Sequence, residues 1–281
     1  METIAFQNGN VTLNAVAAGP KRGPVVVLLH GFPEFWYGWQ KQIDPLAAAG
    51  LRVIVPDQRG YNKSSKPSGV RSYALTELVS DVTAIADQLG RERIFLAGHD
   101  WGAAVAWSVA LLHPNRVAKL AILNVPHPSV MRRYLMKNRR QLRKSWYMFF
   151  FQLPYLPEAF LSASNFRRGV ASLAGSSRPG TFSEDDLAQY RAAWSQPGAL
   201  TAMIHWYRAA FRHRATFPDR TVRVPTRILW GVRDRFLMAE MAQDSLRYCT
   251  QAELITFPDA THWLQHEEPI RVAELLIDFF R

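Results

Sequence analysis

Short apolar runs recur along the chain and alternate with longer stretches of helical pattern. Four of these runs lack the polar residue at every second position that marks a half-exposed strand. We therefore predict that they are strands buried on both faces of a sheet. They cover residues 25–29, 52–55, 93–97 and 120–123. Two more strands are predicted ahead of them, at residues 3–7 and 10–17.

Helical patterns fill the intervals between the strands. Between residues 75 and 89 the apolar positions recur at steps of three and four, as one face of a helix requires. Residues 36–49 and 103–112 are also predicted to be helical. After Pro225 the alternation returns, with strands at 226–230 and 252–257 and helices at 239–248 and 270–280. Alternating strands and helices predict an α/β fold with a mostly parallel sheet and helices on both faces.

The alternation is interrupted between residues 128 and 220, where helical patterns and Pro or Gly breaks occur without a convincing strand. We interpret this segment as a helical lid inserted into a core formed by residues 1–127 and 221–281. Residues 130–147 are predicted to form one basic amphipathic helix. Its apolar face would consist of Met131, Leu135, Leu142 and Trp146.

Composition narrows the class of protein. The chain has 281 residues, of which 48% are hydrophobic and 20% charged, the range of globular domains rather than of disordered or fibrous chains. Cys249 is the single cysteine, so an intrachain disulfide is excluded. No apolar run approaches the length of a membrane span, and the first residues lack the basic and apolar regions of a signal peptide. These features lead us to expect a cytoplasmic protein.

The formal net charge is +11, and most of the excess lies in the lid. Residues 128–220 contain 15 lysines and arginines against 5 aspartates and glutamates. The simplest interpretation is a solvated lid surface. A weak association with an anionic membrane surface and an attraction for acidic substrates are the alternatives. Nucleic acid is not expected as a partner, because no recognisable binding module accompanies the charge.

The strand predicted at residues 93–97 leads into the sequence Gly-His-Asp-Trp-Gly, and a helix follows. This is the pattern of a nucleophile elbow, with Asp100 at the position that usually holds serine. Gly98 and Gly102 suit so sharp a turn, because side chains there would collide with the adjacent strand and helix. The turn holds its central residue in a strained conformation and pushes it into the pocket. The competing interpretation of Asp100 is an ordinary helix N-cap.

Asp234 and His262 follow the strands predicted at residues 226–230 and 252–257. In a parallel sheet such positions meet at the carboxyl ends of the strands, where ligands bind. Their order along the chain, nucleophile then acid then histidine, is that of enzymes with this elbow. We therefore predict that Asp234 orients His262 for catalysis. Asp259 is interpreted as a turn former, and His266 as a surface residue.

The sequence His-Gly-Phe-Pro follows the first buried strand. Its predicted role is to bring the backbone N–H of Phe32 next to that of Trp101, since two converging N–H groups form an oxyanion hole. The peptide bond between Phe32 and Pro33 is a candidate for the cis form. His30 is interpreted as structural, and Gly31 as a support of the loop.

These motifs, with Asp-Gln-Arg-Gly-Tyr at residues 57–61, resemble the epoxide hydrolase branch of the α/β-hydrolase superfamily over nearly the whole chain. The lid is similar to the epoxide hydrolase 3 and 4 type, through Phe-Phe-Phe-Gln-Leu-Pro and Ser-Gln-Pro-Gly. In that family two lid tyrosines hold the epoxide oxygen, and the resemblance assigns this role to Tyr147 and Tyr207. Trp36 and Trp206, which stand in matching motifs, are expected at the substrate pocket.

An aspartate nucleophile restricts the substrate by its own chemistry. A carboxylate that attacks a saturated carbon forms an ester, which water can cleave, whereas serine would form a stable ether. Asp100 therefore indicates an epoxide carbon or a carbon–halogen bond. An opening epoxide needs an acid, which Tyr147 and Tyr207 would supply, whereas a departing halide needs N–H donors and no proton. The expected product is a vicinal diol, and neither a cofactor nor a metal is expected.

Two alternatives stay open. One is a haloalkane or haloacid dehalogenase of the same fold. Haloalkane dehalogenases usually have Asn at the position of Phe32 but share Trp101, and fluoroacetate dehalogenases have Arg at the positions of Trp101 and Ala104. In both groups the acid often follows the sixth strand, where this chain has Asn124. The other alternative is a catalytically silent binding protein, against which the complete set of expected site residues argues.

Overall fold

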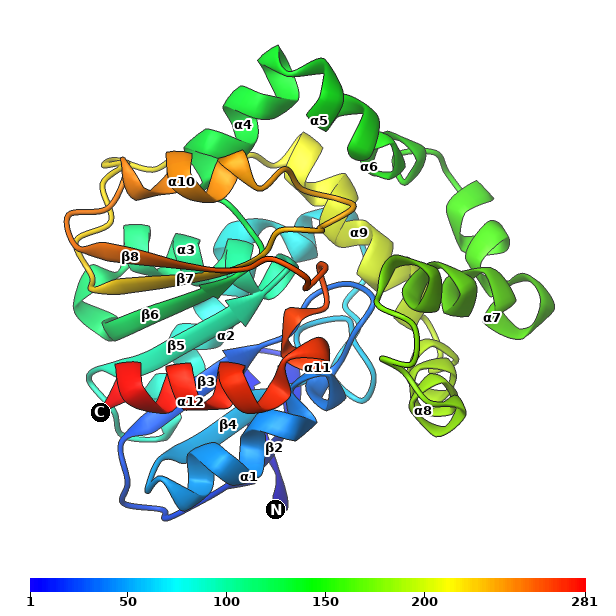
Figure 1. Cartoon of the computed structure of the whole chain (residues 1–281). Helices are drawn as coiled ribbons and strands as arrows, with labels where there is room; N and C mark the ends of the chain where they lie inside the picture. Colours follow the sequence, from blue (N-terminus) through cyan, green and yellow to red (C-terminus); the bar gives the residue numbers. More distant parts are fainter.

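Eight strands form one sheet in the computed structural model, which describes residues 1–281 (Figure 1). Their order across the sheet is β1-β2-β4-β3-β5-β6-β7-β8. The bounds are Glu2–Asn8 (β1), Val11–Ala18 (β2), Val25–Leu29 (β3), Arg52–Pro56 (β4), Ile94–His99 (β5), Val117–Leu123 (β6), Thr226–Gly231 (β7) and Ala252–Phe257 (β8). Strand β2 pairs antiparallel with β1 and β4, and the other neighbours pair in parallel. The predicted α/β fold is confirmed.

Helices cover both faces of this sheet. Their bounds are Gln40–Ala48 (α1), Leu75–Gln88 (α2), Trp101–Leu112 (α3), Glu240–Leu246 (α10), Leu264–Glu267 (α11) and Pro269–Phe280 (α12). Side chains of α2, α3 and α10 form one apolar core with the sheet, and those of α1 and α12 form a second core on the opposite face. Strands β3 and β4 are buried along their whole length, so both of their faces require such a cover.

The lid consists of six helices that lie between β6 and β7 in the chain (Figure 1). They are Pro128–Lys137 (α4), Arg139–Lys144 (α5), Trp146–Phe150 (α6), Leu156–Ser176 (α7), Glu184–Trp194 (α8) and Ala199–Arg212 (α9). Helix α7 is interrupted at residues 163–166, where the backbone is not helical. The predicted helical insertion is therefore present. None of the helices combines the length and the apolar character needed to cross a membrane.

The prediction of one continuous helix at residues 130–147 is wrong, because the segment forms the three short helices α4, α5 and α6. Asn138 ends α4, and its side chain accepts hydrogen bonds from two backbone N–H groups at the start of α5. Such an N-cap starts a new helix in a new direction. Leu142 and Trp146 are left 41% and 61% exposed. Their apolar pattern marks an outer surface of the lid.

Candidate active site

Asp100 lies between β5 and α3, at the carboxyl end of a central strand. Its backbone angles are φ 50° and ψ −124°, a conformation that a residue other than glycine adopts only when its surroundings impose it. A Cβ on Gly98 would lie 2.4 Å from the carbonyl oxygen of Gly102, and one on Gly102 would lie 2.2 Å from that of Leu29. Both glycines are therefore required for the turn. The Asp100 side chain makes no N-cap hydrogen bond, which argues against the N-cap interpretation.

The Asp100 carboxylate is held from two sides. The backbone N–H of Phe32 donates to Oδ1 at 2.7 Å, and Nε2 of His262 lies 3.4 Å from Oδ2. The backbone at Gly31 passes so close to the Asp100 side chain that a Cβ on Gly31 would lie 2.2 Å from the Cβ of Asp100. Trp101 is the first residue of α3, where a backbone N–H has no acceptor within the helix. One expected oxyanion donor thus faces the carboxylate, and the other follows it directly in the chain.

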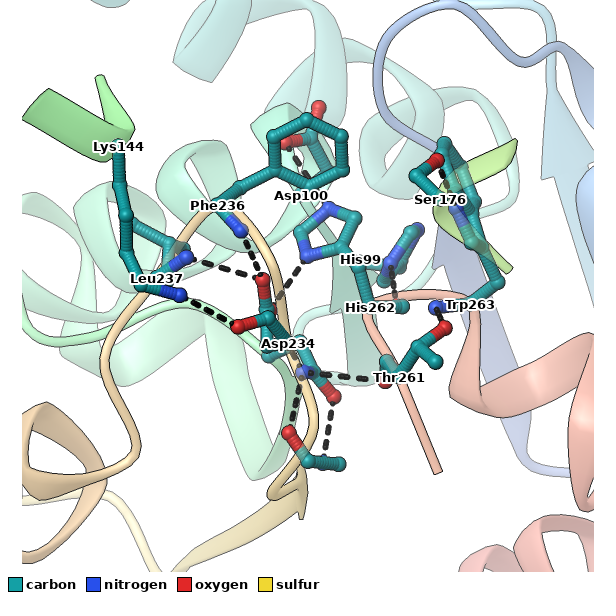
Figure 2. Close-up of polar contacts among 12 residues, drawn as sticks. His99, Asp100, Lys144, Ser176, Asp234, Phe236, Leu237, Thr261, His262 and Trp263 are labelled. Atoms are coloured by element: carbon teal, nitrogen blue, oxygen red, sulfur yellow. Dashed lines mark hydrogen bonds and ion pairs between the residues drawn. The ribbon is translucent and has the colours of Figure 1, made fainter. Parts of the chain in front are cut away.

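His262 bridges two carboxylates (Figure 2). Its Nδ1 bonds Oδ2 of Asp234 at 2.7 Å, and its Nε2 faces Asp100. Oδ1 of Asp234 accepts hydrogen bonds from the backbone N–H groups of Phe236 and Leu237 at 2.7 and 2.9 Å. The loop after β7 thus fixes the Asp234 carboxylate, and that carboxylate fixes the orientation of the imidazole ring.

Asn124, to which sequence reasoning gave no role, completes this arrangement. It follows β6 with a φ of 52°, and its Nδ2 donates to Oδ2 of Asp234 at 2.8 Å. Its Oδ1 accepts a hydrogen bond from the backbone N–H of Gly231 at 2.9 Å. Its signal in the sequence is its place after the sixth strand, the position at which dehalogenases of this fold often have the acid. The structure shows that Asn124 is instead a partner of the acid.

His262, Asp100 and Asp234 shift one another's pKa values in this buried site. Burial disfavours the imidazolium form of His262, but the negative charges of Asp234 and Asp100 outweigh it and raise the pKa of His262 to about 10. Burial also opposes ionisation of the two carboxyls, yet His262 holds the pKa values of Asp100 and Asp234 below their ordinary range. At neutral pH Asp100 is therefore the carboxylate that a nucleophile requires. Asp259 stays outside this group and pairs with Arg233 at the surface.

A second buried carboxylate supports the loops around the site. Glu34 accepts a hydrogen bond from Tyr190 at 2.9 Å and bonds ring nitrogens of His99 and His266 at 3.0 and 2.6 Å. The other ring nitrogen of His99 bonds the backbone carbonyl of His262 at 2.7 Å (Figure 2). The interpretation of His266 as a surface residue is wrong, because α11 turns its ring inward onto Glu34. This network joins the His262 loop, the end of β5 and the lid helix α8.

His30 lies beneath the loop that carries Phe32. The backbone N–H of Gln58 donates to its Nε2 at 3.0 Å, and its Nδ1 bonds the carbonyl of Gly31 at the same distance. Burial lowers the pKa of His30 to about 4, so the ring is neutral. These contacts agree with a structural role. The peptide bond between Phe32 and Pro33 is cis, as expected.

A cavity of about 140 Å³ adjoins Asp100. Asp100 and His262 line it from the core, and Tyr147 of α6 and Tyr207 of α9 line it from the lid. Asp234 lies behind His262, out of the cavity. Most of the remaining wall is apolar, including Phe32, Phe151, Phe166, Trp194, Met203 and Trp263. No group of three or more His, Cys, Asp and Glu side chains is arranged to hold a metal ion.

The two lid tyrosines pack edge to face, with ring centroids 5.9 Å apart. The ring of Tyr207 also packs against Phe32 and Trp101, with ring centroids 5.3 and 5.1 Å apart. Burial, reinforced by the negative charge of Asp100, raises the pKa of both Tyr147 and Tyr207. Both phenols are therefore protonated at neutral pH, and each can donate a hydrogen bond to a ligand in the cavity.

Trp36 and Trp206, expected at the substrate pocket, do not line this cavity. The indole of Trp206 donates to the backbone carbonyl of Arg59 at 2.9 Å and is buried. Successive residues of a helix point about 100° apart, so when Tyr207 faces the cavity its neighbour faces the core. Trp36 begins a short 3₁₀ helix, Trp36–Trp39, and packs against Phe35.

Comparison with known proteins identifies the family. The family model described as the α/β hydrolase fold matches residues 24–269. The AB hydrolase superfamily protein YfhM of Bacillus subtilis is 44% identical over 277 residues, which cover 98% of this chain and 97% of that protein. Human epoxide hydrolase 4 is 36% identical over 284 residues, which cover 99% of this chain and 78% of that protein. The crystal structure of a Bacillus megaterium epoxide hydrolase with an inhibitor has a TM-score of 0.90 and 30% identity, covering 99% of both chains. The chain therefore belongs to the α/β-hydrolase superfamily, as an epoxide hydrolase-like member.

Proposed function

We propose that this protein adds water to an epoxide and releases a vicinal diol, by way of an ester formed on Asp100. The observation that carries the proposal is the cavity shared by Asp100, His262 and the two lid phenols of Tyr147 and Tyr207. A carboxylate is the nucleophile that a saturated carbon requires, and phenols are the acids that an opening ring requires. The relatives named as epoxide hydrolases support the same activity.

In the first step, an oxygen of Asp100 attacks an epoxide carbon and the ring C–O bond breaks. The alkoxide takes a proton from Tyr147 or Tyr207, whose raised pKa values keep both phenols protonated until then. The ester removes the negative charge of Asp100 from beside His262, so the pKa of His262 falls. The imidazolium of His262 then gives one proton to the tyrosinate through water in the cavity, which restores the phenol. The ester is left beside a neutral imidazole.

In the second step, neutral His262 takes a proton from water, and the hydroxide attacks the carbonyl carbon of the ester. The backbone N–H of Phe32, which donates to Oδ1 of Asp100 at 2.7 Å, is positioned to stabilise the negative oxygen that forms. The intermediate expels the diol oxygen, which takes the proton of the new hydroxyl group. Asp100 is again a carboxylate and His262 an imidazolium. The sum is epoxide plus water to diol.

A carbon–halogen bond is the competing substrate for an aspartate nucleophile. A departing halide needs N–H donors and no proton. The Trp101 indole packs edge-on against Trp206 and Tyr207 and does not line the cavity. The phenols of Tyr147 and Tyr207 do line it. This difference favours the epoxide.

A turnover panel separates the substrate classes. Styrene oxide, an epoxy fatty acid, a 1-haloalkane and fluoroacetate are each incubated with the protein, and the release of diol and of halide is measured. We expect diol from the epoxides and no halide, and we expect Asp100→Asn to produce neither. Halide release without diol would replace the proposal with a dehalogenase. An epoxide that raises the Tm without being turned over would indicate a silent binding protein.

A further inference from the structure

The lid has an outer surface that is both apolar and exposed. Most of the large hydrophobic side chains that the structure leaves exposed lie between residues 136 and 160. We call the main group of these the lid patch; it comprises Trp146, Phe149, Leu153, Tyr155, Leu156 and Phe160. Trp146 is 61% exposed and Tyr155 is 85% exposed. A cluster of this kind marks a contact surface rather than ordinary scatter of apolar residues.

Ring contacts through Phe150 connect two members of the lid patch, Trp146 of α6 and Phe160 of α7. The ring centroid of Trp146 lies 6.0 Å from that of Phe150, which lies 5.6 Å from that of Phe160. The guanidinium of Arg168 stacks over the Phe160 ring at 4.2 Å. The patch thus runs from α6 onto α7, on a side of the lid that lies well away from both chain ends (Figure 1).

Exposed basic residues flank the lid patch along the chain and have no acidic partners. Exposed examples are Lys137, Arg139, Arg140, Arg143, Arg167 and Arg168, none of which forms an ion pair. Between residues 128 and 183 the only acidic residue is Glu158. Its carboxylate is held by the guanidinium of Arg208 at 2.6 Å. The positive charge around the patch is therefore uncompensated.

We propose that the lid patch docks on an anionic lipid bilayer. Exposed aromatic and aliphatic side chains beside arginines are typical of protein surfaces that lie in the membrane interface. There the apolar groups enter the headgroup boundary, and the basic groups attract anionic lipids. A second copy of the chain would bring like charges together. A nucleic acid would use the charge but leave Leu153 and Leu156 exposed to water.

Docking in this way would also turn the cavity toward the bilayer. Trp146 belongs to the lid patch and lines the cavity, and Leu161, just beyond Phe160, lines it as well. An apolar epoxide concentrates in the hydrocarbon of a membrane. This consequence rests on the proposed function, whereas the docking itself does not.

Vesicle flotation of the whole protein tests the docking. The vesicles consist of phosphatidylcholine alone or of phosphatidylcholine with phosphatidylserine. We expect binding to the anionic vesicles only, and weaker binding at high salt. Replacing Arg139, Arg140 and Arg143 by Gln should weaken the partitioning about a hundredfold, because each basic residue at such a surface contributes about a fivefold change.

A matched variant removes the same charge elsewhere. Lys21, Arg22 and Arg271 are exposed residues of the core, outside the lid. Replacing these three residues by Gln should leave binding close to that of the wild type. An equal loss in the two charge variants would overturn the proposal, because it would assign the binding to net charge alone.

A third variant tests the apolar part of the lid patch at constant charge. Leu153, Tyr155 and Leu156 are all replaced by Ser, and we expect weaker vesicle binding. Fluorescence of the wild type should shift to the blue on anionic vesicles, and this shift should diminish in Trp146→Phe. Undiminished binding by the serine variant, or no binding by the wild type, would overturn the proposal.

Two controls keep these outcomes distinct. Thermal melts monitored by circular dichroism verify that each variant is folded. Analytical ultracentrifugation without vesicles detects self-association, and a dimer that dissociates when the lid patch is changed would assign the surface to a second copy instead. Flotation needs no epoxide turnover, so its failure and a failure of the proposed function are separate results.

Discussion

Replacing Asp100 by Asn reproduces the loss of negative charge that ester formation would cause, with little change in shape. Nε2 of His262 lies 3.4 Å from Oδ2 of Asp100. At an effective dielectric constant of about 20, unit charges at that distance interact by about 5 kcal/mol. This energy corresponds to roughly three to four pKa units. Because the pKa of His262 is about 10 in the free protein, we expect it to fall to about 7 in Asp100→Asn.

Histidine NMR measures this shift directly. The imidazole resonances of the wild type and of Asp100→Asn are followed through a pH titration, and His262→Gln identifies the signal of His262. A value near 7 would place His262 in the range of a general base only after Asp100 has lost its charge. The same pKa in both proteins would refute the reasoning, as would a wild-type pKa below that of a free histidine.

The same proton links stability to pH. The pKa of His262 is about 10 in the folded protein, against an ordinary value of 6.5. A raised pKa contributes stability that is complete below the unfolded value and is lost as the pH rises through the folded value. The free energy of unfolding, from urea titrations, should therefore fall between about pH 6.5 and about pH 10. The fall should be much smaller in Asp100→Asn. If the unfolding free energy falls equally steeply with pH in the two proteins, the raised pKa of His262 does not depend on Asp100.

The remaining predictions concern the base, the acids and the turn. In His262→Gln the ester should form and persist, so that intact mass rises by one epoxide and diol release falls about 10²- to 10⁴-fold; no adduct would point to another base. Tyr147→Phe and Tyr207→Phe should each slow ester formation in single turnovers, and unchanged rates in both would remove the phenols from the mechanism. Gly102→Ala should lower the Tm steeply because its Cβ would meet backbone at 2.2 Å, whereas Gly175→Ala, with nothing within 4 Å, should not.

The sheet and the turn around Asp100 could be predicted because they depend on local signals. Buried parallel strands are apolar without alternation, and this pattern located the strand that leads to Asp100. The strands before Asp234 and His262 were located by the return of alternating strands and helices after Pro225. Gly98 and Gly102 could be interpreted because any chain with this turn needs glycine there, where a side chain would collide with the backbone. Strand order then brings the three residues together, since the carboxyl ends of parallel strands share one edge of the sheet.

Other features depend on contacts that no local pattern contains. Asn138 divides a periodic segment because its side chain caps a new helix, and periodicity cannot distinguish an apolar face packed inside from one exposed outside. Asn124 is recognisable as a partner of Asp234 only when both are seen together. The same holds for His266, whose burial follows from the position of Glu34, more than two hundred residues earlier.

A single turnover in oxygen-18 water tests the central claim most directly. Protein in excess over epoxide is allowed one cycle and digested, and the peptide that contains Asp100 and the released diol are both weighed. If water cleaves an ester on Asp100, its oxygen enters that carboxylate and the diol takes an oxygen from the protein. The account predicts one heavy oxygen in the Asp100 peptide and none in the diol. A heavy diol with an unlabelled peptide would mean that water attacks the epoxide directly, and would contradict it.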